Sequence, residues 1–315
     1  MCIRDRREAG RLLERGLHPL VLVQGFREAL TTTFEHLAEH THLCADEPTI
    51  LTAVARTAMN GTSADSGGNE LAQLVVEALT LVSSNGIDHE DVRMAKRTQG
   101  NLFDTRLVPG LVLETALTLD RLPRRLEAGT VLTFTCPLDQ EEATRDTELE
   151  VSDASQWMKF IEAQEALLQA KTDAVLATGA TAIFSAGTIE PSVFHALTDA
   201  GCFVLGGIER HGIEDLAKAT GASMCDHLDD AHEATLGRFE RLEIETSEDL
   251  DGRRERLCLR VGEQPGLVTL DVGGGDGAAV EEIIRALYDA LRSTSLAMQT
   301  NEVVRGGGSI TWELR

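Results

Sequence analysis

A glycine-rich stretch between a predicted strand and a predicted helix is the first place where this sequence could do chemistry. Residues 271–277 read DVGGGDG, and AAVEEIIRALYDAL follows directly. Glycines ahead of a helix N-terminus can point backbone N–H groups and the positive helix end at a phosphate. They also suit a plain turn, because glycine adopts positive φ angles at no steric cost. The residues leave both interpretations open, a phosphate loop and a strand-to-helix turn.

The details of this stretch favour the turn. A Walker A motif needs Gly-Lys-Ser/Thr, and the dinucleotide pattern GxGxxA fits only from Gly273, which places Asp276 against the phosphates. A small-molecule α/β enzyme using residues 273–277 remains an alternative function. Such an enzyme would lose nucleotide binding when Gly275 is replaced by a bulky residue.

Other catalytic and metal-binding patterns are weak. There is no GxSxG elbow for a Ser-His-Asp hydrolase. His36 and His40 stand four residues apart in a predicted helix, but without a third ligand or an HExxH motif we expect a solvated helix face and no metal site. The six cysteines stand singly, which predicts buried free thiols and no zinc site or disulfide framework. They are Cys2, Cys44, Cys136, Cys202, Cys225 and Cys258.

The charge is strongly acidic: 52 Asp and Glu against 29 Lys and Arg give −23, and the pI is about 4.7. Nucleic acids and anionic membranes are poor partners for such a surface. Only four of the 29 basic residues are lysine. An acidic surface rich in arginine favours a halophilic protein from a salt-loaded cytoplasm, where screening weakens self-repulsion, over the alternative of an ordinary acidic protein from a mesophile.

Length and hydropathy predict a soluble cytoplasmic protein of two or three domains. A chain of 315 residues with 42% apolar residues can bury more than one core. No apolar run reaches the roughly 18 residues of a membrane helix, and the N-terminus lacks the order of a signal peptide.

The elements that position these residues change in character along the chain. The first six residues, MCIRDR, fit no following pattern, and we leave them out of the fold prediction as a cloning or assembly remnant. Helices are predicted first, and after an amphipathic helix at 154–176, strands and helices alternate. In the helix after DVGGGDG, the apolar stripe leaves Asp289 on the exposed side. The early helices are predicted at 7–16, 19–40, 49–59 and 69–82.

Taken in order, several stretches resemble the group II chaperonins, the family of the thermosome and the eukaryotic cytosolic chaperonin. Each stretch is weak alone, but together they cover nearly all of residues 7–315 in the family order. They are GLHPLVLVQGFREAL (16–30), TAMNGT (57–62), NLFDTRLVPGLVLE (101–114), RLPRRLEAGTVLTFTCPLD (121–139), IEDLAKATGA (213–222), LVTLDVGGGDGAAVEEIIRALYDALR (267–292) and VVRGGGSITWEL (303–314).

The resemblance implies a multi-domain α/β fold built from nested segments. A partial, mainly helical equatorial domain would comprise residues 7–44 and 304–315. An α/β intermediate domain would comprise 45–112 and 265–303. The apical α/β domain would be 113–264, with a helical protrusion at about 139–176 that forms the lid.

The resemblance also implies a site for ATP and Mg²⁺. Asp289 would be the catalytic residue that orients the attacking water. Thr62 stands where the family usually carries a lysine, so we expect altered γ-phosphate sensing or lid timing. The residues implied to contact the nucleotide are Asn60, Gly61, Gly307 and Gly308.

The implied function is a subunit of a double-ring chaperone whose ATP hydrolysis closes a built-in lid over non-native proteins. Trp157, Met158 and Phe160 would offer apolar surface to these clients, although core packing explains each residue singly as well. The alternative is an ATP-independent holdase.

The family's main phosphate and Mg²⁺ motif, GDGTT, is expected before residue 7, and a further equatorial segment after Arg315. We therefore expect a fragment that does not hydrolyse ATP alone. Residues 275–279 imitate GDGTT by coincidence, and their expected task is to start the helix that delivers Asp289.

Overall fold

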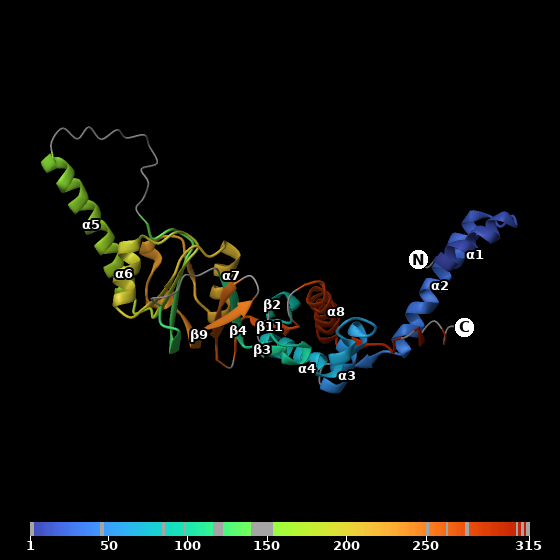
Figure 1. Ribbon diagram of the computed structural model, residues 1–315. Helices are drawn as coiled ribbons and strands as arrows, with labels where there is room; N and C mark the ends of the chain where they lie inside the picture. Colours follow the sequence, from blue (N-terminus) through green and yellow to red (C-terminus); the bar gives the residue numbers. More distant parts are fainter. Residues whose placement is uncertain are drawn as a thin grey trace.

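The computed structural model shows an elongated molecule in which three groups of elements follow one another (Figure 1). The first group contains two helices, the middle group packs helices on a small sheet, and the third contains the largest sheet. The structure describes residues 3–44, 47–83, 86–97, 99–115, 122–139, 154–249, 252–262, 264–274 and 277–306, together with 308, 309 and 312.

The first group consists of α1 (Ile3–Glu14) and α2 (Pro19–Glu39). Gly16, at φ 90°, follows α1, and α2 begins where the Leu20 amide donates to His18 Nδ1 at 3.2 Å. Placing all six leading residues outside the fold was wrong, because α1 begins at Ile3. None of the residues of α2, all of them described, is buried.

The middle group packs three helices on a small sheet. β11 is buried along its whole length, parallel to β2 and antiparallel to β3, and its apolar side chains join the core of the helices. The predicted helices at 49–59 and 69–82 are confirmed as α3 and α4. The elements are α3 (Pro48–Met59), α4 (Gly68–Val82), α8 (Ala278–Thr300), β2 (Val92–Arg97), β3 (Arg106–Val108) and β11 (Val268–Gly273).

The largest sheet in the described ranges has seven strands in the order β4-β10-β9-β5-β6-β7, with β8 beside β5. Residues of α7 pack into the core on one face, and residues of α5 and α6 into the core on the other. α5 extends away from the sheet (Figure 1). The elements are β4 (Gly110–Thr115), β5 (Arg125–Phe134), α5 (Ala154–Ala177), β6 (Ala182–Ser185), α6 (Pro191–Asp199), β7 (Phe203–Leu205), α7 (Arg210–Thr220), β8 (Met224–Cys225), β9 (Gly237–Asp249) and β10 (Gly252–Arg260).

The chain passes twice between neighbouring groups, and the two passages lie side by side each time. Between the first and middle groups, β1 (His42–Leu43) pairs antiparallel with β12 (Glu302–Val303). Between the middle group and the large sheet, the Val261 amide donates to the Pro109 carbonyl at 2.8 Å. Gly110 is required there, because a Cβ on it would lie 2.2 Å from the Leu259 carbonyl oxygen.

The cysteines, the hydropathy of the helices and the short 3₁₀ helices complete the description of the fold. Cys44, Cys202, Cys225 and Cys258 are buried free thiols as predicted, and Cys136 is a half-buried free thiol; Cys2 lies outside the described residues. Across the described chain, no helix combines the length and apolar character needed to cross a membrane. Short 3₁₀ helices occupy Asp65–Gly67, His89–Asp91, Leu102–Asp104, Leu228–Asp230 and Glu233–Thr235.

Candidate nucleotide site and client-binding surface

α3 and α8 form the helix pair that positions the candidate catalytic residue. They pack antiparallel: Leu51, near the start of α3, shares a core with Ala297, near the end of α8. Met59 and Leu287 belong to the larger core of the middle group. The apolar stripe predicted for α8 is confirmed: Ile284 is half-buried, and the other members, Val280, Ile283, Leu287 and Leu291, are buried.

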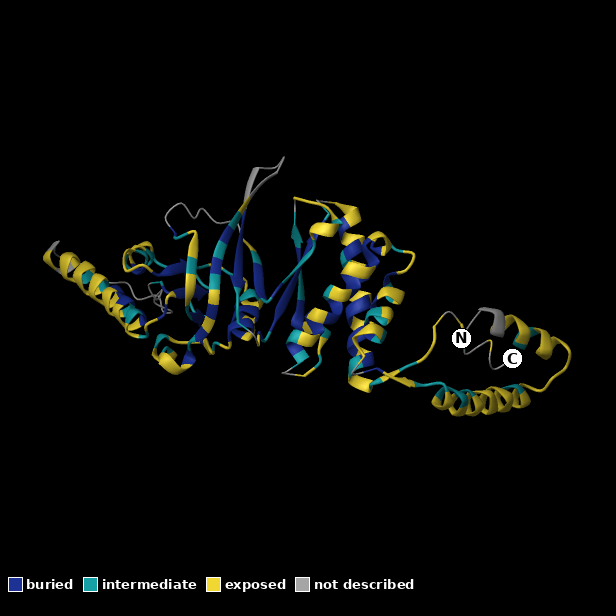
Figure 2. Cartoon of the chain, turned by 90° about the horizontal axis from the view of Figure 1, so that it is seen from below, coloured by how far each residue is buried: buried dark blue, intermediate teal, exposed yellow. Residues whose placement is uncertain are grey.

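Asp289 lies on the exposed side of α8, one residue before the fully buried Ala290. The Ser293 hydroxyl donates to the backbone carbonyl of Asp289 at 2.8 Å. Figure 2 shows the helices of the middle group with a buried face and an exposed face. The amphipathic period of α8 therefore leaves the Asp289 carboxylate accessible to a ligand.

Asn60, Gly61 and Thr62 form the loop after α3. Asn60 is exposed, and Gly61 has φ 74°, a conformation that favours glycine. The Thr62 hydroxyl donates to the Met59 carbonyl at 2.6 Å and accepts from the Ala64 amide at 3.2 Å. The side chain that stands in place of the family's lysine thus closes its own loop.

The antiparallel packing places the middle of α8, where Asp289 lies, level with the C-terminal end of α3, where this loop begins. Thr57 and Ser293 line one groove between the helices. Asn60 follows Thr57 by about one helical turn, and Asp289 precedes Ser293 by about one turn. Because the helices are antiparallel, the step forward from Thr57 to Asn60 and the step backward from Ser293 to Asp289 point the same way along the pair.

The groove has a volume of about 800 Å³ and lies among α2, α3, α8 and the segment after β12. Its walls are largely apolar, with Ile50, Val54 and Leu296 among them, and Arg305 of the segment after β12 also lines it. A Cβ on Gly306 would lie 3.9 Å from Thr57 Cγ2, so this segment runs against α3. Gly308 has φ 78°, and Gly307 lies outside the described residues.

Two described glycines, Gly274 and Gly277, lie between β11 and α8. Gly274 has φ 144°, and Gly277, with φ 114°, precedes the first residue of α8. A Cβ on Gly274 would lie 2.7 Å from Val280 Cγ2. Gly275 and Asp276 lie outside the described residues. The described glycines adopt positive φ angles, which both a strand-to-helix turn and a phosphate loop use.

The candidate client-binding residues lie on the first turns of α5. Trp157 is 53% and Met158 62% exposed, while Phe160 is half-buried. The Trp157 and Phe160 rings stack with centroids 6.0 Å apart. Of the expected protrusion, residues 140–153 lie outside the described chain. Trp157 and Met158 are therefore not core residues of the described part of the chain.

A buried ion cluster that our sequence reasoning missed joins the small sheet to the large one. Asp271 of β11 is fully buried; it accepts from Arg106 Nε at 3.0 Å and from Arg256 Nη1 at 2.7 Å. Glu245 of β9 accepts from the same arginines at 2.6 and 2.8 Å. The available clue was an acid within the apolar run LVTLDVG, because a buried acid needs a partner.

Opposing effects act on the Glu245 carboxyl. Burial disfavours its charged form, but hydrogen bonds and charges from Arg106 and Arg256 outweigh the burial, so the pKa of Glu245 is lowered from its ordinary value. The carboxylate stays ionised between the two guanidinium groups.

Two further ion pairs connect the small sheet to α7 of the large-sheet group. Arg93 of β2 donates from Nε and Nη2 to the two carboxylate oxygens of Asp215, each at 2.8 Å. Lys218 donates to Asp91, just before β2. Ion pairs therefore hold the junction from two sides.

The fold is that of a multi-domain α/β protein, as predicted: a large sheet with a projecting helix joined to a helix-covered small sheet. The chain belongs to the TCP-1/cpn60 chaperonin family, whose model matches residues 7–315. The resemblance to group II chaperonins is thereby confirmed.

Two relatives and one solved structure illustrate the match. The thermosome subunit of Methanopyrus kandleri is 30% identical over 305 residues, which are 95% of this chain and 55% of the relative. The thermosome subunit beta of Aeropyrum pernix is 30% identical over 98% of this chain and 57% of its own length. The open-state monomer of a group II chaperonin from Methanococcoides burtonii has the same fold, with TM-score 0.66 and 23% identity over 98% of this chain and 71% of that one. The chain spans about half the length of these curated relatives.

Proposed function

We propose that this chain is part of a subunit of an ATP-dependent ring chaperone that captures and folds non-native proteins. In this proposal residues 7–44 and 304–315 belong to an equatorial domain, 45–112 and 265–303 to an intermediate domain, and 113–264 to an apical domain. Hydrolysis of ATP tilts the intermediate domain and closes the lid over the client.

The observation that carries the proposal is the position of Asp289. Asp289 is exposed at the middle of α8, which the antiparallel packing places level with the end of α3 that precedes Asn60 and Gly61. A carboxylate there can accept a hydrogen bond from a water and orient it for attack on a phosphoryl group.

In this proposal the described residues supply part of the contacts to a nucleotide. When bound, ATP supplies the transferable phosphoryl group, and Mg²⁺ neutralises its charge. Asn60 offers a side-chain amide. Gly61 and Gly308 adopt positive φ angles and, as glycines, have no side chain to block the approach of their backbone to the ligand. Gly307 belongs to the same proposed contact. Thr62, turned into its own loop, leaves the γ-phosphate without the usual lysine charge.

The client side of the proposal rests on α5. Trp157, Met158 and Phe160 gather aromatic and thioether surface on its first turns, and non-native proteins expose the apolar segments that bind such surfaces. The proposed partners are further subunits of a double ring in a halophilic cytoplasm, with no role for nucleic acid or membrane at a surface of charge −23.

A chimeric subunit tests the catalytic assignment. Residues 7–315 are joined to the flanking equatorial segments of the Methanopyrus kandleri thermosome subunit, and ATP hydrolysis is measured for the chimera and its parent. Asp289→Asn is expected to lower the chimera's rate by about a hundredfold or more, the scale of losing general base catalysis. Glu282→Gln, a change two turns earlier on an exposed part of α8, is the matched control. Equal rates for the Asp289→Asn chimera and the unmodified chimera would refute the assignment.

The alternative is an ATP-independent holdase, favoured by the exposure of Trp157 and Met158, which requires no nucleotide. Aggregation of a heat-denatured client is followed by light scattering with the chimera described above, with and without ATP, because the 315-residue chain is not expected to hydrolyse ATP alone. Suppression that ATP leaves unchanged supports the holdase for this chain. Client release by ATP supports the cycling chaperone.

A further inference from the structure

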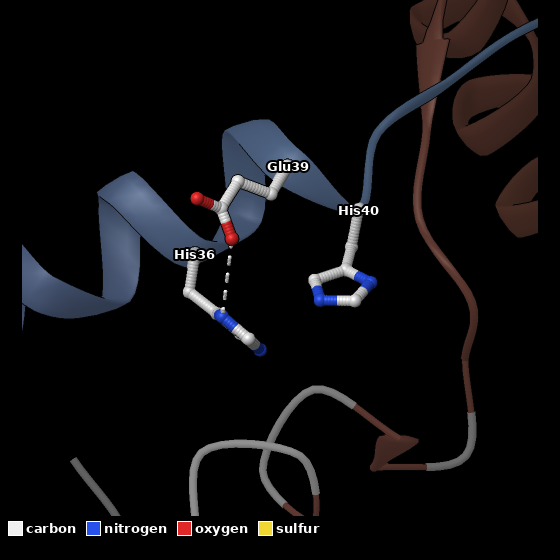
Figure 3. A group of neighbouring side chains, drawn as sticks. All are labelled: His36, Glu39 and His40. Atoms are coloured by element: carbon white, nitrogen blue, oxygen red, sulfur yellow. Dashed lines mark ion pairs between the residues drawn. The ribbon is translucent and has the colours of Figure 1, made fainter.

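The last turn of α2 gathers three potential metal ligands. His36, Glu39 and His40 project from one side of the helix (Figure 3). Residues three and four positions apart are neighbours on a helix surface. Each side chain offers one ligand atom, and these atoms all lie within 4.8 Å of one another. The sequence left the histidine pair without a third ligand, and Glu39, at spacing i+3, supplies it.

The side chains are close to the geometry of a bound ion. His36 Nδ1 lies 3.9 Å from Glu39 Oε2, and the two imidazole centroids are 4.4 Å apart. Two ligand atoms that each lie about 2 Å from one ion are at most about 4 Å from each other. The Glu39 side chain is 76% exposed and can swing to close the remaining gap, while His36, at 24%, is held against its surroundings.

The donor types select the kind of ion. Two imidazole nitrogens and one carboxylate oxygen suit divalent ions of the zinc class, such as Zn²⁺, Co²⁺ and Ni²⁺. Mg²⁺ prefers oxygen ligands and retains its water, so it is a poor match. Three protein ligands on one helix face leave coordination positions for water.

We propose that His36, Glu39 and His40 form a binding site for one divalent transition-metal ion of the zinc class. The site is separate from the Mg²⁺ of the proposed nucleotide site and does not depend on that proposal. His40 follows the last residue of α2. The next residues, Thr41 and His42, line the groove, and His42 is the first residue of β1. A bound ion would fasten the end of α2 where the chain passes into the middle group.

The test uses the purified 315-residue chain and Co²⁺, whose visible absorption reports coordination by nitrogen and oxygen. One Co²⁺ per chain is expected, displaced by Zn²⁺ and not by excess Mg²⁺. Glu39→Gln and His40→Gln are each expected to weaken Zn²⁺ binding, measured by calorimetry, by about tenfold or more. A loss of about tenfold is already seen when only a residue hydrogen-bonded to a metal ligand is replaced. Hydrogen exchange in the last turn of α2 is expected to slow on addition of Zn²⁺.

Two control variants distinguish metal binding at this site from nonspecific binding of metal ions to an acidic protein surface. Glu35→Gln removes the same charge from the same helix, and His195→Gln removes an exposed histidine of α6; both should bind as the unmodified chain does. Glu39 is exposed, so Glu39→Gln tests the site without a loss of folding, which circular dichroism checks. Absence of stoichiometric Co²⁺ binding, displacement by Mg²⁺, or equal affinity in the Glu39→Gln and Glu35→Gln variants would each overturn the proposal.

Discussion

Asp271 lies at the centre of the junction between the two sheets, fully buried between Arg106 and Arg256. Asp271→Asn leaves both guanidinium groups without this carboxylate charge. Removing one partner from a buried ion pair costs about 3 to 5 kcal/mol, because the remaining charge stays desolvated. We expect a loss of this size in the free energy of unfolding, measured by urea denaturation.

The matched control is Glu281→Gln, which breaks the exposed pair between Glu281 and Lys96. Water and salt screen such a pair, so little change in stability is expected. An Asp271→Asn protein as stable as the Glu281→Gln protein would show that the junction does not depend on the buried charge.

Glu245 makes the junction sensitive to acid. Its pKa is lowered in the folded chain, so between its ordinary value of 4.5 and the lowered value the unfolded state binds more protons. Its contribution to stability is therefore complete above pH 4.5 and is lost as the pH falls through the folded-state pKa. Glu245→Gln is expected to flatten the fall in urea midpoint on acidification. An unchanged slope would mean that other carboxylates carry the effect.

Single residues were predictable from the sequence where local periodicity determined their environment. The exposure of Asp289 followed from the apolar stripe of α8, which needs no knowledge of distant segments. The ion cluster could not be predicted in this way. Arg106 and Asp271 are 165 residues apart in the sequence, and only the pairing of β3 with β11 brings them together.

At the scale of elements, α2 and α8 have similar lengths and opposite environments. α2 has 21 residues and buries none, whereas α8 has 23 and buries nine. Elements with few buried contacts open at low free energy. We expect the amides of α2 to exchange at least about a hundredfold faster than those of α8, a difference of about 3 kcal/mol in opening free energy.

Hydrogen exchange followed by mass spectrometry measures this difference. Phe26, Leu30 and Phe34 are all exposed on α2, so a covering surface in solution would slow its exchange. Comparable protection in α2 and α8 would contradict the prediction and would mean that another surface covers α2.

Long elements were predictable and their pairing was not. The helix expected at 154–176 is confirmed as α5 at Ala154–Ala177, because a run of this length without Gly or Pro and rich in Ala, Gln, Glu and Leu favours a helix. The antiparallel pairing of β5 with β9 joins segments far apart in the chain, and no local pattern specifies it. The start of α1 at Ile3 was missed because its first turn carries charged residues without an apolar stripe.

At the scale of the whole molecule, the domain boundaries near 45, 113, 265 and 304 stay predictions. The structure adds that the chain crosses each junction as a pair of adjacent segments, β1 with β12 and Pro109 with Val261. Paired crossings let two neighbouring groups move as bodies about a short connection. Ion pairs hold the junction to the large sheet, whereas at the β1 and β12 crossing the described contacts include the strand pairing and the Cys44 amide, which donates to Asn301 Oδ1 at 3.0 Å.

The net charge of −23 sets how the whole molecule responds to salt. Repulsion among exposed acids opposes the compact state, and raising KCl shortens the Debye length from about 10 Å at 0.1 M to about 3 Å at 1 M. Buried pairs such as Arg256 with Asp271 are screened much less than exposed charges, so relief of repulsion outweighs the weakening of the junction.

We therefore expect the midpoint of thermal unfolding, followed by circular dichroism, to rise with KCl. A gain of 1 kcal/mol corresponds to roughly 2 to 4 °C for a domain of this general size. The rise should level off once the Debye length is shorter than the spacing of surface charges. Sucrose is the control: it is excluded from the protein surface but does not screen charges, so it should give a steady increase. A midpoint that stays constant or falls between 0.1 and 1 M KCl would contradict adaptation to a salt-loaded cytoplasm, because the exposed acids would then not be limiting stability.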